Sequence, residues 1–192
     1  MPAAGLLLAA GAGRRMGGPK ALVELDGELL VHRALRVLAA GGAAPPTVVV
    51  GAQAARVRAA VGGAAEVVEA ADWAEGMGAS LRAGLTALEP TAAQAVVVHL
   101  VDLPGVTAEA VARLVALGTP GALARAAYGG APAHPVLLGR AHWPAVREAA
   151  VGDAGARGYL RGNPAVVLVE CGDIATPEDV DTPEQLHSRE WR

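Results

Sequence analysis

Asp102 is placed where an acidic side chain could hold a metal ion. It follows the apolar run at residues 96–101 and precedes Leu103-Pro104, so we expect it at the end of a buried strand. In an open α/β sheet, ligands bind beyond the carboxyl ends of the strands, and a carboxylate there can bind a hard cation through oxygen. The same spacing also fits an aspartate that caps a helix at residues 107–118.

A second acidic stretch, Asp-Val-Asp-Thr-Pro-Glu, begins at Asp179. The carboxylates of Asp179 and Asp181 are two residues apart, so they point the same way in an extended segment. Thr182-Pro183-Glu184 has the pattern of a helix start. Mg²⁺ is commonly held by one or two carboxylates, because phosphate and water complete its shell. By itself the stretch also fits a solvated capping feature.

A glycine-rich segment with three basic side chains, LAAGAGRRMGGPK, runs from Leu8 to Lys20. Glycines let backbone N–H groups approach a phosphate, and Arg14, Arg15 and Lys20 add positive charge. The segment is not a P-loop, because proline separates the last glycine from the lysine and no Ser or Thr follows. It is not a dinucleotide fingerprint either, because the third glycine would fall on Met16. It predicts a phosphate-binding loop; a glycine-rich turn with basic surface residues is the alternative.

Three further segments carry polar residues at element boundaries. Trp73–Leu85 predicts a glycine turn into a helix, whose free N–H groups and Ser80 could hold a base, ribose or phosphate. His134 precedes the strand at residues 135–138, a position where histidine is more often structural. In the segment at residues 152–157, an aspartate could cap the next helix and Arg157 could reach an anionic ligand.

The elements expected around these motifs alternate between strand and helix. Continuous apolar strands between amphipathic helices predict a mostly parallel sheet covered on both faces, a three-layer α/β/α sandwich in one domain spanning residues 1–192. Strands are expected at Ala4–Ala9, Thr47–Val50, Glu66–Val68, Ala95–Val101, Ala122–Ala127, Pro135–Leu138 and Val166–Glu170, and helices at Leu29–Ala40, Ala54–Ala60, Ala79–Leu88, Ala108–Ala116, Trp143–Ala149 and Gly155–Arg161.

Composition narrows the classes of protein. A net charge of −3 argues against a nucleic-acid binder, which normally carries a basic face. Cys171 is the single cysteine, so an intramolecular disulfide is excluded. The apolar run at residues 5–10 is too short for a membrane span and lacks the basic start of a signal peptide. We therefore expect a cytoplasmic protein without nucleic-acid or membrane partners, and a monomer.

The segment from Leu8 to Lys20 resembles the L-A-A-G-x-G-x-R-M-G-x-P-K signature of the MobA-like NTP transferases, which share the Rossmann-like nucleotide-diphospho-sugar transferase (GT-A-like) fold. Asp102-Leu103-Pro104 resembles the family's Asp-x-Pro, which carries the catalytic metal. The stretch from Asp179 resembles its D-x-D-T-P-E-D element, with Gln185 in place of the last aspartate, a change expected at the surface.

The resemblance implies roles for these residues. Lys20, Arg15 and Asp102 are expected to be catalytic, and His134 and Arg157 to contact the acceptor. Mg²⁺ or Mn²⁺ is expected at Asp102, Asp181 and Asp179. The residues implied in nucleotide binding are Leu8, Ala9, Ala10, Gly11, Gly13, Arg14, Arg15, Lys20, Gly76, Ser80 and Asp102.

Three segments look like the molybdenum-cofactor cytidylyltransferase branch of this family. They are Trp73–Leu85 (W-x-x-G-M-x-x-S-L-x-x-G-L), the His-Pro-Val-Leu at 134–137 and the Gly-Asp-Ala-Gly-Ala-Arg at 152–157. Ala10, where guanylyl-transferring relatives have glycine, implies CTP as the preferred donor. Ala70, Ala133 and Val101 depart from the branch, which usually has Asn, Gly and Gly there.

The function implied is Mg²⁺-dependent transfer of CMP from CTP to a phosphorylated acceptor, with molybdenum cofactor as the expected acceptor and pyrophosphate as the product. Such transfer relies on positioning and on charge neutralisation, and an anionic acceptor phosphate requires no general base. The alternatives are a sugar-phosphate nucleotidyltransferase, a chaperone that delivers nucleotide cofactor to a molybdoenzyme partner, and a recruited NAD(P)H-dependent oxidoreductase that acts on a nicotine-derived pigment.

Overall fold

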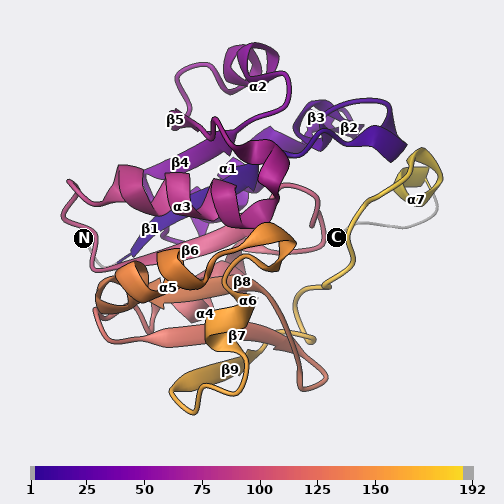
Figure 1. Ribbon diagram of the computed structural model, residues 1–192. Helices are drawn as coiled ribbons and strands as arrows, with labels where there is room; N and C mark the ends of the chain where they lie inside the picture. The colour runs from indigo at the N-terminus through magenta and orange to yellow at the C-terminus, as the bar shows by residue number, and fades with distance from the viewer. Residues whose placement is uncertain (1–2, 188–192) are drawn as a thin grey trace.

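A seven-stranded sheet runs through the centre of the computed structural model, which describes residues 3–187 (Figure 1). The strand order is β5-β4-β1-β6-β8-β7-β9, and β8 alone runs antiparallel to the other six. The strands are β1 (Ala3–Ala9), β4 (Pro46–Val50), β5 (Glu66–Glu69), β6 (Ala95–Leu100), β7 (Leu123–Tyr128), β8 (Ala131–Gly139) and β9 (Val166–Glu170).

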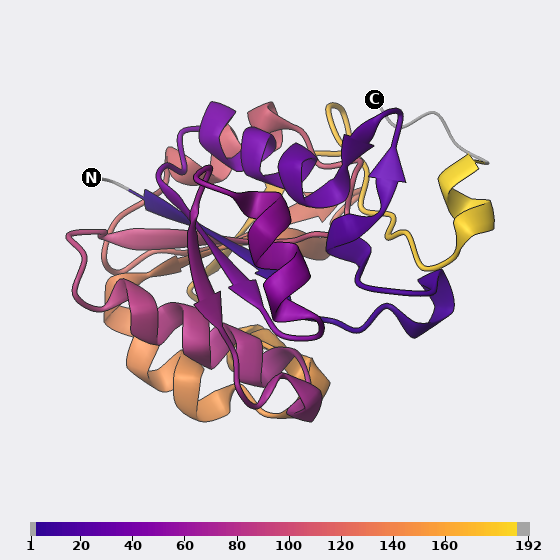
Figure 2. The same ribbon diagram turned by 90° about the horizontal axis from the view of Figure 1, so that it is seen from above.

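Helices cover both faces of this sheet, as the view from above shows (Figure 2). One face carries α1 (Leu30–Ala40), α2 (Ala54–Val61) and α4 (Ala108–Val115); the other carries α3 (Met77–Leu88), α5 (Trp143–Ala149) and α6 (Arg157–Leu160). The predicted three-layer α/β/α fold with a mostly parallel, mixed sheet is therefore confirmed. Among residues 3–187, no helix is long and apolar enough to cross a membrane.

The central strands are apolar on both faces because each face packs against a layer of helices. In β6, Ala95 and Val97 pack with the cluster around α1 and α4, while Val96 and Val98 pack with the cluster around α3 and α5. All four residues are buried. Such a continuous apolar run is the expected signature of a parallel strand covered on both sides. This packing holds β6 in place, and with it the position of Asp102 just beyond the carboxyl end of the strand.

Three local features differ from the sequence prediction. The strand expected at Pro135–Leu138 begins at Ala131, because residues 131–132 pair with the end of β7, so His134 lies within β8 and does not precede it. A hairpin of β2 (Glu24–Leu25) and β3 (Glu28–Leu29) precedes α1, and its turn residues Asp26 and Gly27 have φ of 52° and 80°. Asp-Gly is the sequence signal for such a turn, so this hairpin could have been predicted. The helix expected from residue 155 begins only at Arg157, because Gly155 has a left-handed φ of 52°. Short 3₁₀ turns occur at Arg14–Met16, Lys20–Leu22, Trp73–Glu75, Arg140–His142 and Gly152–Ala154.

His99 is a polar residue inside this core. It lies on β6 with 1% of its surface exposed, and its Nδ1 atom has no hydrogen-bond partner. Burial, with a smaller contribution from His134, lowers the pKa of His99 from 6.5 to about 3. The imidazole is therefore neutral in the folded protein at neutral pH.

We predict that His99→Leu makes the stability of the protein less sensitive to acid. Between about pH 6.5 and pH 3 the unfolded chain binds a proton at His99 that the folded chain does not, so stability falls as the pH falls, by up to about 1.4 kcal/mol per pH unit. Urea unfolding of wild type and variant between pH 7 and pH 4.5 measures the slope. An unchanged slope in the variant would show that His99 is not buried in its neutral form.

Candidate functional site

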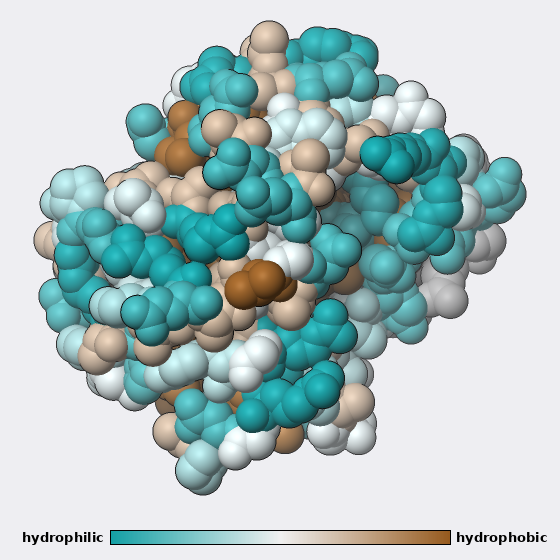
Figure 3. All heavy atoms as spheres, in the orientation of Figure 1, coloured by the Kyte–Doolittle hydropathy of each residue, from teal (hydrophilic) through white to brown (hydrophobic). Residues whose placement is uncertain are grey.

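A cavity of about 440 Å³ opens at the carboxyl ends of β1 and β6. Its walls come from the loop after β1, the start of α3 and the end of β6. The surface in the orientation of Figure 1 has a hollow rimmed by hydrophilic side chains, between the body of the sheet and the elements β2, β3 and α7 (Figure 3). Open α/β sheets bind their ligands at this edge.

The loop after β1 is held by a tight turn at Gly13. Its φ is 58°, and a Cβ atom there would lie 1.9 Å from the carbonyl oxygen of Gly18, so only glycine fits. The N–H groups of Met16 and Gly18 both donate to the Gly13 carbonyl. The loop therefore has a fixed path. Arg14 lies at the cavity wall, whereas the guanidinium of Arg15 points toward Asp181.

Lys20 joins this loop to both acidic stretches. Its Nζ atom lies 2.7 Å from Asp102 Oδ2 and 2.5 Å from Asp181 Oδ1. Arg15 Nη2 lies 2.8 Å from the other oxygen of Asp181. Burial opposes the charge of Lys20, but its hydrogen bonds and attraction to the two carboxylates raise its pKa above the usual value. The lysine hydrogen bond also lowers the pKa of Asp181, so the pair stays ionised.

Asp102, Asp179 and Asp181 form a compact carboxylate cluster. Each offers an oxygen atom within 4.8 Å of the others. Oxygen ligands in such a group suit Mg²⁺ or Mn²⁺, and the cluster lies beside the glycine loop that would supply phosphate contacts. The predicted convergence of the two acidic stretches is present in the structure. Asp102 is not a helix cap, because Thr107 Oγ1 accepts the N–H of Ala110 at the start of α4.

Backbone hydrogen bonds bring the chain after β9 back across the molecule to this cluster. Cys171 donates to Ala127 on β7, Thr176 donates to Gly105, and Val180 donates to the carbonyl of Asp102 itself. Both ribbon views show the loop after β1 and the segment that leads to α7 (Pro183–His187) side by side (Figures 1 and 2). The contacts with Lys20 and Arg15 explain that proximity.

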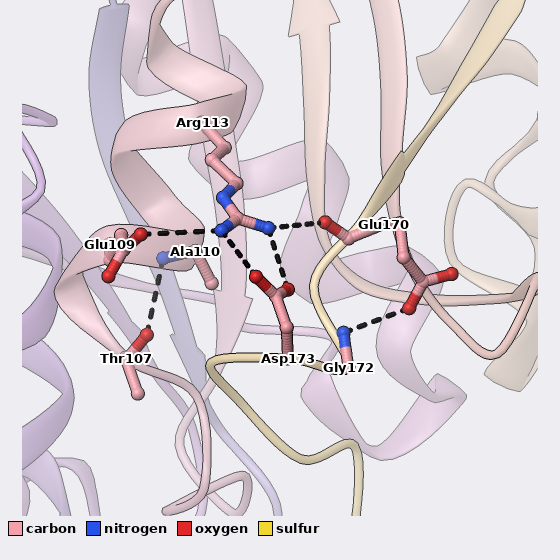
Figure 4. Close-up of polar contacts among 7 residues, drawn as sticks. All are labelled: Thr107, Glu109, Ala110, Arg113, Glu170, Gly172 and Asp173. Atoms are coloured by element: carbon pink, nitrogen blue, oxygen red, sulfur yellow. Dashed lines mark hydrogen bonds and ion pairs between the residues drawn. The ribbon is translucent and has the colours of Figure 1, made fainter.

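An arginine on α4 fixes the start of this returning segment (Figure 4). Arg113 binds Asp173 with two N–O distances of 2.8 Å and donates to the carbonyl of Glu170 at 2.7 Å. A weaker contact of 3.3 Å reaches Glu109 within the helix. The hydrogen bond from Arg113 lowers the pKa of Asp173. A bidentate pair of this kind fixes direction as well as distance.

The helix after Asp181 also begins on a defined cap. The side-chain oxygen of Gln185 accepts the N–H groups of Asp181 and Thr182, at 2.6 and 3.0 Å. With proline at the first helical position, this arrangement is one half of a capping box, because the N–H of Gln185 donates to the backbone carbonyl of Thr182. Gln185 is exposed, as expected, but it orients the backbone that carries Asp181.

The start of α3 forms the wall opposite the loop. Ser80 is buried at this wall, and Gly76 has a φ of 117°. A Cβ on Gly76 would lie 2.5 Å from Asp153 Oδ1, so the turn at residues 152–154 packs directly on this glycine. Asp153 does not cap α6, which has no side-chain cap; its side chain borders the cavity instead.

A second cavity of about 270 Å³ adjoins the first, and Leu8, Met77 and Asp153 line both. His134 and Arg157 lie there, together with Arg125 of β7. Burial and the charge of Arg125 lower the pKa of His134 to about 4, so its ring is neutral at neutral pH. The structure thus separates the two residues expected at the acceptor from the loop expected at the nucleotide.

The structure gathers the predicted nucleotide residues at the first cavity, apart from Arg15, which reaches Asp181 instead. Those that line it are Leu8, Ala9, Ala10, Gly11, Gly13, Arg14, Lys20, Gly76, Ser80 and Asp102. Trp73, Met77 and Asp153 line the same cavity, and Arg125 lines the second one, without having been predicted as site residues. The first three lie inside motifs recognised in the sequence; Arg125 lies in an expected strand without such a signal.

The fold and the site together define an α/β protein with a glycine-rich basic loop and a carboxylate cluster at one sheet edge. Residues 5–167 match the MobA-like NTP transferase domain. The chain is 40% identical to the nicotine blue oxidoreductase of Paenarthrobacter nicotinovorans, over 95% of this chain and 94% of that protein. It is 31% identical to the molybdenum cofactor guanylyltransferase of Rhodobacter capsulatus, over 100% and 97% of the two chains.

A solved structure has the same fold. Rv0371c of Mycobacterium tuberculosis H37Rv, in complex with manganese, superposes with a TM-score of 0.79 at 25% identity, over 98% of this chain and 100% of that one. The chain belongs to the MobA-like NTP transferase family.

We predict that Arg113→Gln loosens the segment that carries Asp179 and Asp181. Without the bidentate pair to Asp173, the amides at residues 174–181 should exchange hydrogen at least about tenfold faster, because the start of the segment is no longer fixed. Hydrogen exchange followed by mass spectrometry measures this. Arg147→Gln removes a comparable arginine–glutamate pair elsewhere and serves as the control. Equal exchange in all three proteins would contradict the positioning role of Arg113.

Proposed function

We propose that this chain is a Mg²⁺-dependent nucleotidyltransferase that moves a nucleotidyl group from an NTP onto a phosphorylated small molecule. The observation that supports it is the contact of Lys20 with Asp102 and Asp181, which joins the glycine-rich basic loop to the carboxylate cluster. Lys20 and Asp102 also line the first cavity. Membership of the NTP transferase family agrees with this arrangement. Phosphoryl transfer depends mainly on positioning and charge neutralisation, and this cavity offers both.

Each part of the site has a role in this proposal. The N–H groups of the loop after β1, with Arg14 and Lys20, bind the triphosphate. Asp102, Asp179 and Asp181 would hold Mg²⁺, or Mn²⁺ in its place, and the ion would neutralise phosphate charge. A phosphate oxygen of the acceptor forms a bond to the α-phosphorus, the bond to the β-phosphate breaks, and pyrophosphate leaves with that electron pair. Lys20 and Arg15 stabilise the negative charge.

CTP is the proposed donor and molybdenum cofactor the proposed acceptor. The donor assignment rests on Ala10, which lines the cavity where guanylyl-transferring relatives have glycine. The acceptor assignment rests on the cytidylyltransferase-like segments around Ser80, His134 and Arg157, which line the two adjoining cavities. A relative named for guanylyl transfer to the same cofactor supports the acceptor more than the donor. A molybdoenzyme that receives the product is the proposed macromolecular partner.

An oxidoreductase is the second candidate, because the relative that is 40% identical is named nicotine blue oxidoreductase. In that case the first cavity binds the nucleotide part of NADH or NADPH, and a planar pigment occupies the second. Hydride transfer does not need the carboxylate cluster, whereas nucleotidyl transfer does. Substitutions in the cluster therefore separate the two candidates.

A pyrophosphate-release assay tests the proposal directly. Purified protein with Mg²⁺ should release pyrophosphate from CTP when molybdenum cofactor is present, and much more slowly from ATP, GTP or UTP. Release with GTP alone would contradict the donor assignment, and release only with sugar phosphates would contradict the acceptor assignment. Consumption of NADH or NADPH with a quinonoid pigment, without pyrophosphate release, would favour the oxidoreductase.

We predict that Asp102→Asn lowers kcat/KM for nucleotidyl transfer by at least about 100-fold, roughly 2.7 kcal/mol of transition-state stabilisation. Asparagine keeps the size of the side chain but removes the charge that the cation and Lys20 both contact. Asp72→Asn, at an exposed aspartate outside this cavity, is the matched control. Steady-state kinetics and thermal unfolding of both variants make the comparison. Near-normal activity in Asp102→Asn would remove this residue from the metal site.

A further inference from the structure

Arg125 is a half-buried positive charge that the proposed reaction does not use. It lies on β7, paired in register with Val136 of the antiparallel strand β8, and it lines the second cavity. Its Nε atom is buried without a hydrogen-bond partner, and its remaining contact, from Nη2 to the carbonyl of Pro132, is long at 3.5 Å. A guanidinium that is partly removed from water normally has a carboxylate or several carbonyl partners, because desolvation of an unpaired charge is costly.

A second positive charge lies close to the first. Arg157 at the start of α6 lines the same cavity. Burial, and then the charge of Arg157, lower the pKa of Arg125 below its ordinary value, which means that the two cations repel each other. Across residues 3–187, neither arginine forms an ion pair with a carboxylate. Asp153 is the one carboxylate among the residues that line this cavity, so two arginines face a single negative charge and the cavity has an excess of positive charge.

His134 adds a hydrogen-bonding group to this pair. Its Nδ1 atom is also buried without a partner, while its backbone carbonyl accepts the hydroxyl of Tyr128. The ring is neutral, so it can donate one hydrogen bond without adding to the repulsion between the arginines. Arg125 and His134, each with one buried nitrogen atom that has no hydrogen-bond partner, thus line the same cavity.

The rest of the second cavity is apolar. Leu81, Val98, Val136 and Leu160 line it, and Asp153 marks the boundary with the first cavity. A ligand that fills it needs an apolar or ring-shaped body and an anionic group that reaches the arginines. The carboxylate cluster, where the attacking phosphate must meet the nucleotide, adjoins the first cavity instead.

We propose that Arg125, Arg157 and His134 form an anion subsite, which binds a second anionic group of the acceptor. This group is separate from the phosphate that attacks the nucleotide. This assignment rests on the proposed function, and it narrows the acceptor to molecules with an anion at each end of an apolar or planar body. Arg125 is then a residue that determines acceptor specificity. A neutral sugar body with a single phosphate leaves both arginines without a counter-ion, and we expect it to bind poorly.

Phenyl phosphate, which joins a dianion to an apolar ring, is a suitable probe of the anion subsite. The full chain carrying ¹⁵N-labelled histidine is titrated with it, and the ring nitrogens of His134 are followed by NMR after assignment with His134→Gln. We expect saturable shifts at His134 in the wild type. Arg125→Met should raise the Kd by at least about tenfold, which corresponds to one lost charge-assisted contact of roughly 1.4 kcal/mol. Phenol should shift His134 only weakly.

Two further variants keep the test decisive. Arg157→Met alters an exposed residue, so it should weaken phenyl phosphate binding without loss of the fold, even where Arg125→Met disturbs β7. Arg161→Met, at an exposed arginine just after α6 that does not line the cavity, should bind like the wild type. Equal affinity in the wild type and both Arg125→Met and Arg157→Met would overturn the proposal, as would phenol binding as tight as that of phenyl phosphate.

The titration involves no turnover, so its result is independent of the pyrophosphate assay. Binding at His134 without pyrophosphate release would support the anion subsite and contradict the proposed transferase activity. Pyrophosphate release without any phenyl phosphate binding at His134 would support the transferase activity and contradict the anion subsite.

Discussion

The contact of the Lys20 ammonium with the carboxylates of Asp102 and Asp181 is the interaction on which the arrangement of the site depends. It joins the loop after the first strand, the end of the central strand β6 and the segment after the last strand. Two carboxylates this close together repel each other unless a cation lies between them. The ammonium group of Lys20 supplies that charge. A divalent cation would compete for the same oxygen atoms, while the phosphates of a nucleotide offer the ammonium other partners.

The sheet topology makes this contact possible and also creates the second cavity. β1 and β6 are neighbours and parallel, so the glycine loop and Asp102 emerge at the same edge. β8 then runs in the opposite direction, which brings His134 at its beginning toward that edge, beside Arg125 on β7. Asp153 packs against Gly76 between the two cavities. One antiparallel strand in a parallel sheet thus places a basic, partly apolar pocket next to the glycine-rich loop after β1.

Much of the fold follows from local sequence pattern. All seven central strands were expected within a few residues, because buried parallel strands such as β4 and β6 are unbroken apolar runs between helices. The convergence of Asp102 with Asp179 and Asp181 required the family resemblance, since the spacing of either stretch alone also fits a cap. The clamp from Arg113 to Asp173 and the role of Arg125 in the second cavity could not be predicted. Both depend on contacts between distant strands and helices, and neither residue lies in a motif.

The central claim is that the three aspartates form one metal site that serves the nucleotide cavity. Electron paramagnetic resonance of free Mn²⁺, titrated with protein in the presence of CTP, tests it most directly. The account predicts saturable Mn²⁺ binding in the wild type, and binding weaker by roughly tenfold or more in Asp181→Asn, because a ligand carboxylate and a partner of Lys20 are lost together. Asp72→Asn, which alters an exposed aspartate outside the cluster, should bind Mn²⁺ like the wild type. Unchanged Mn²⁺ binding in Asp181→Asn would contradict the account.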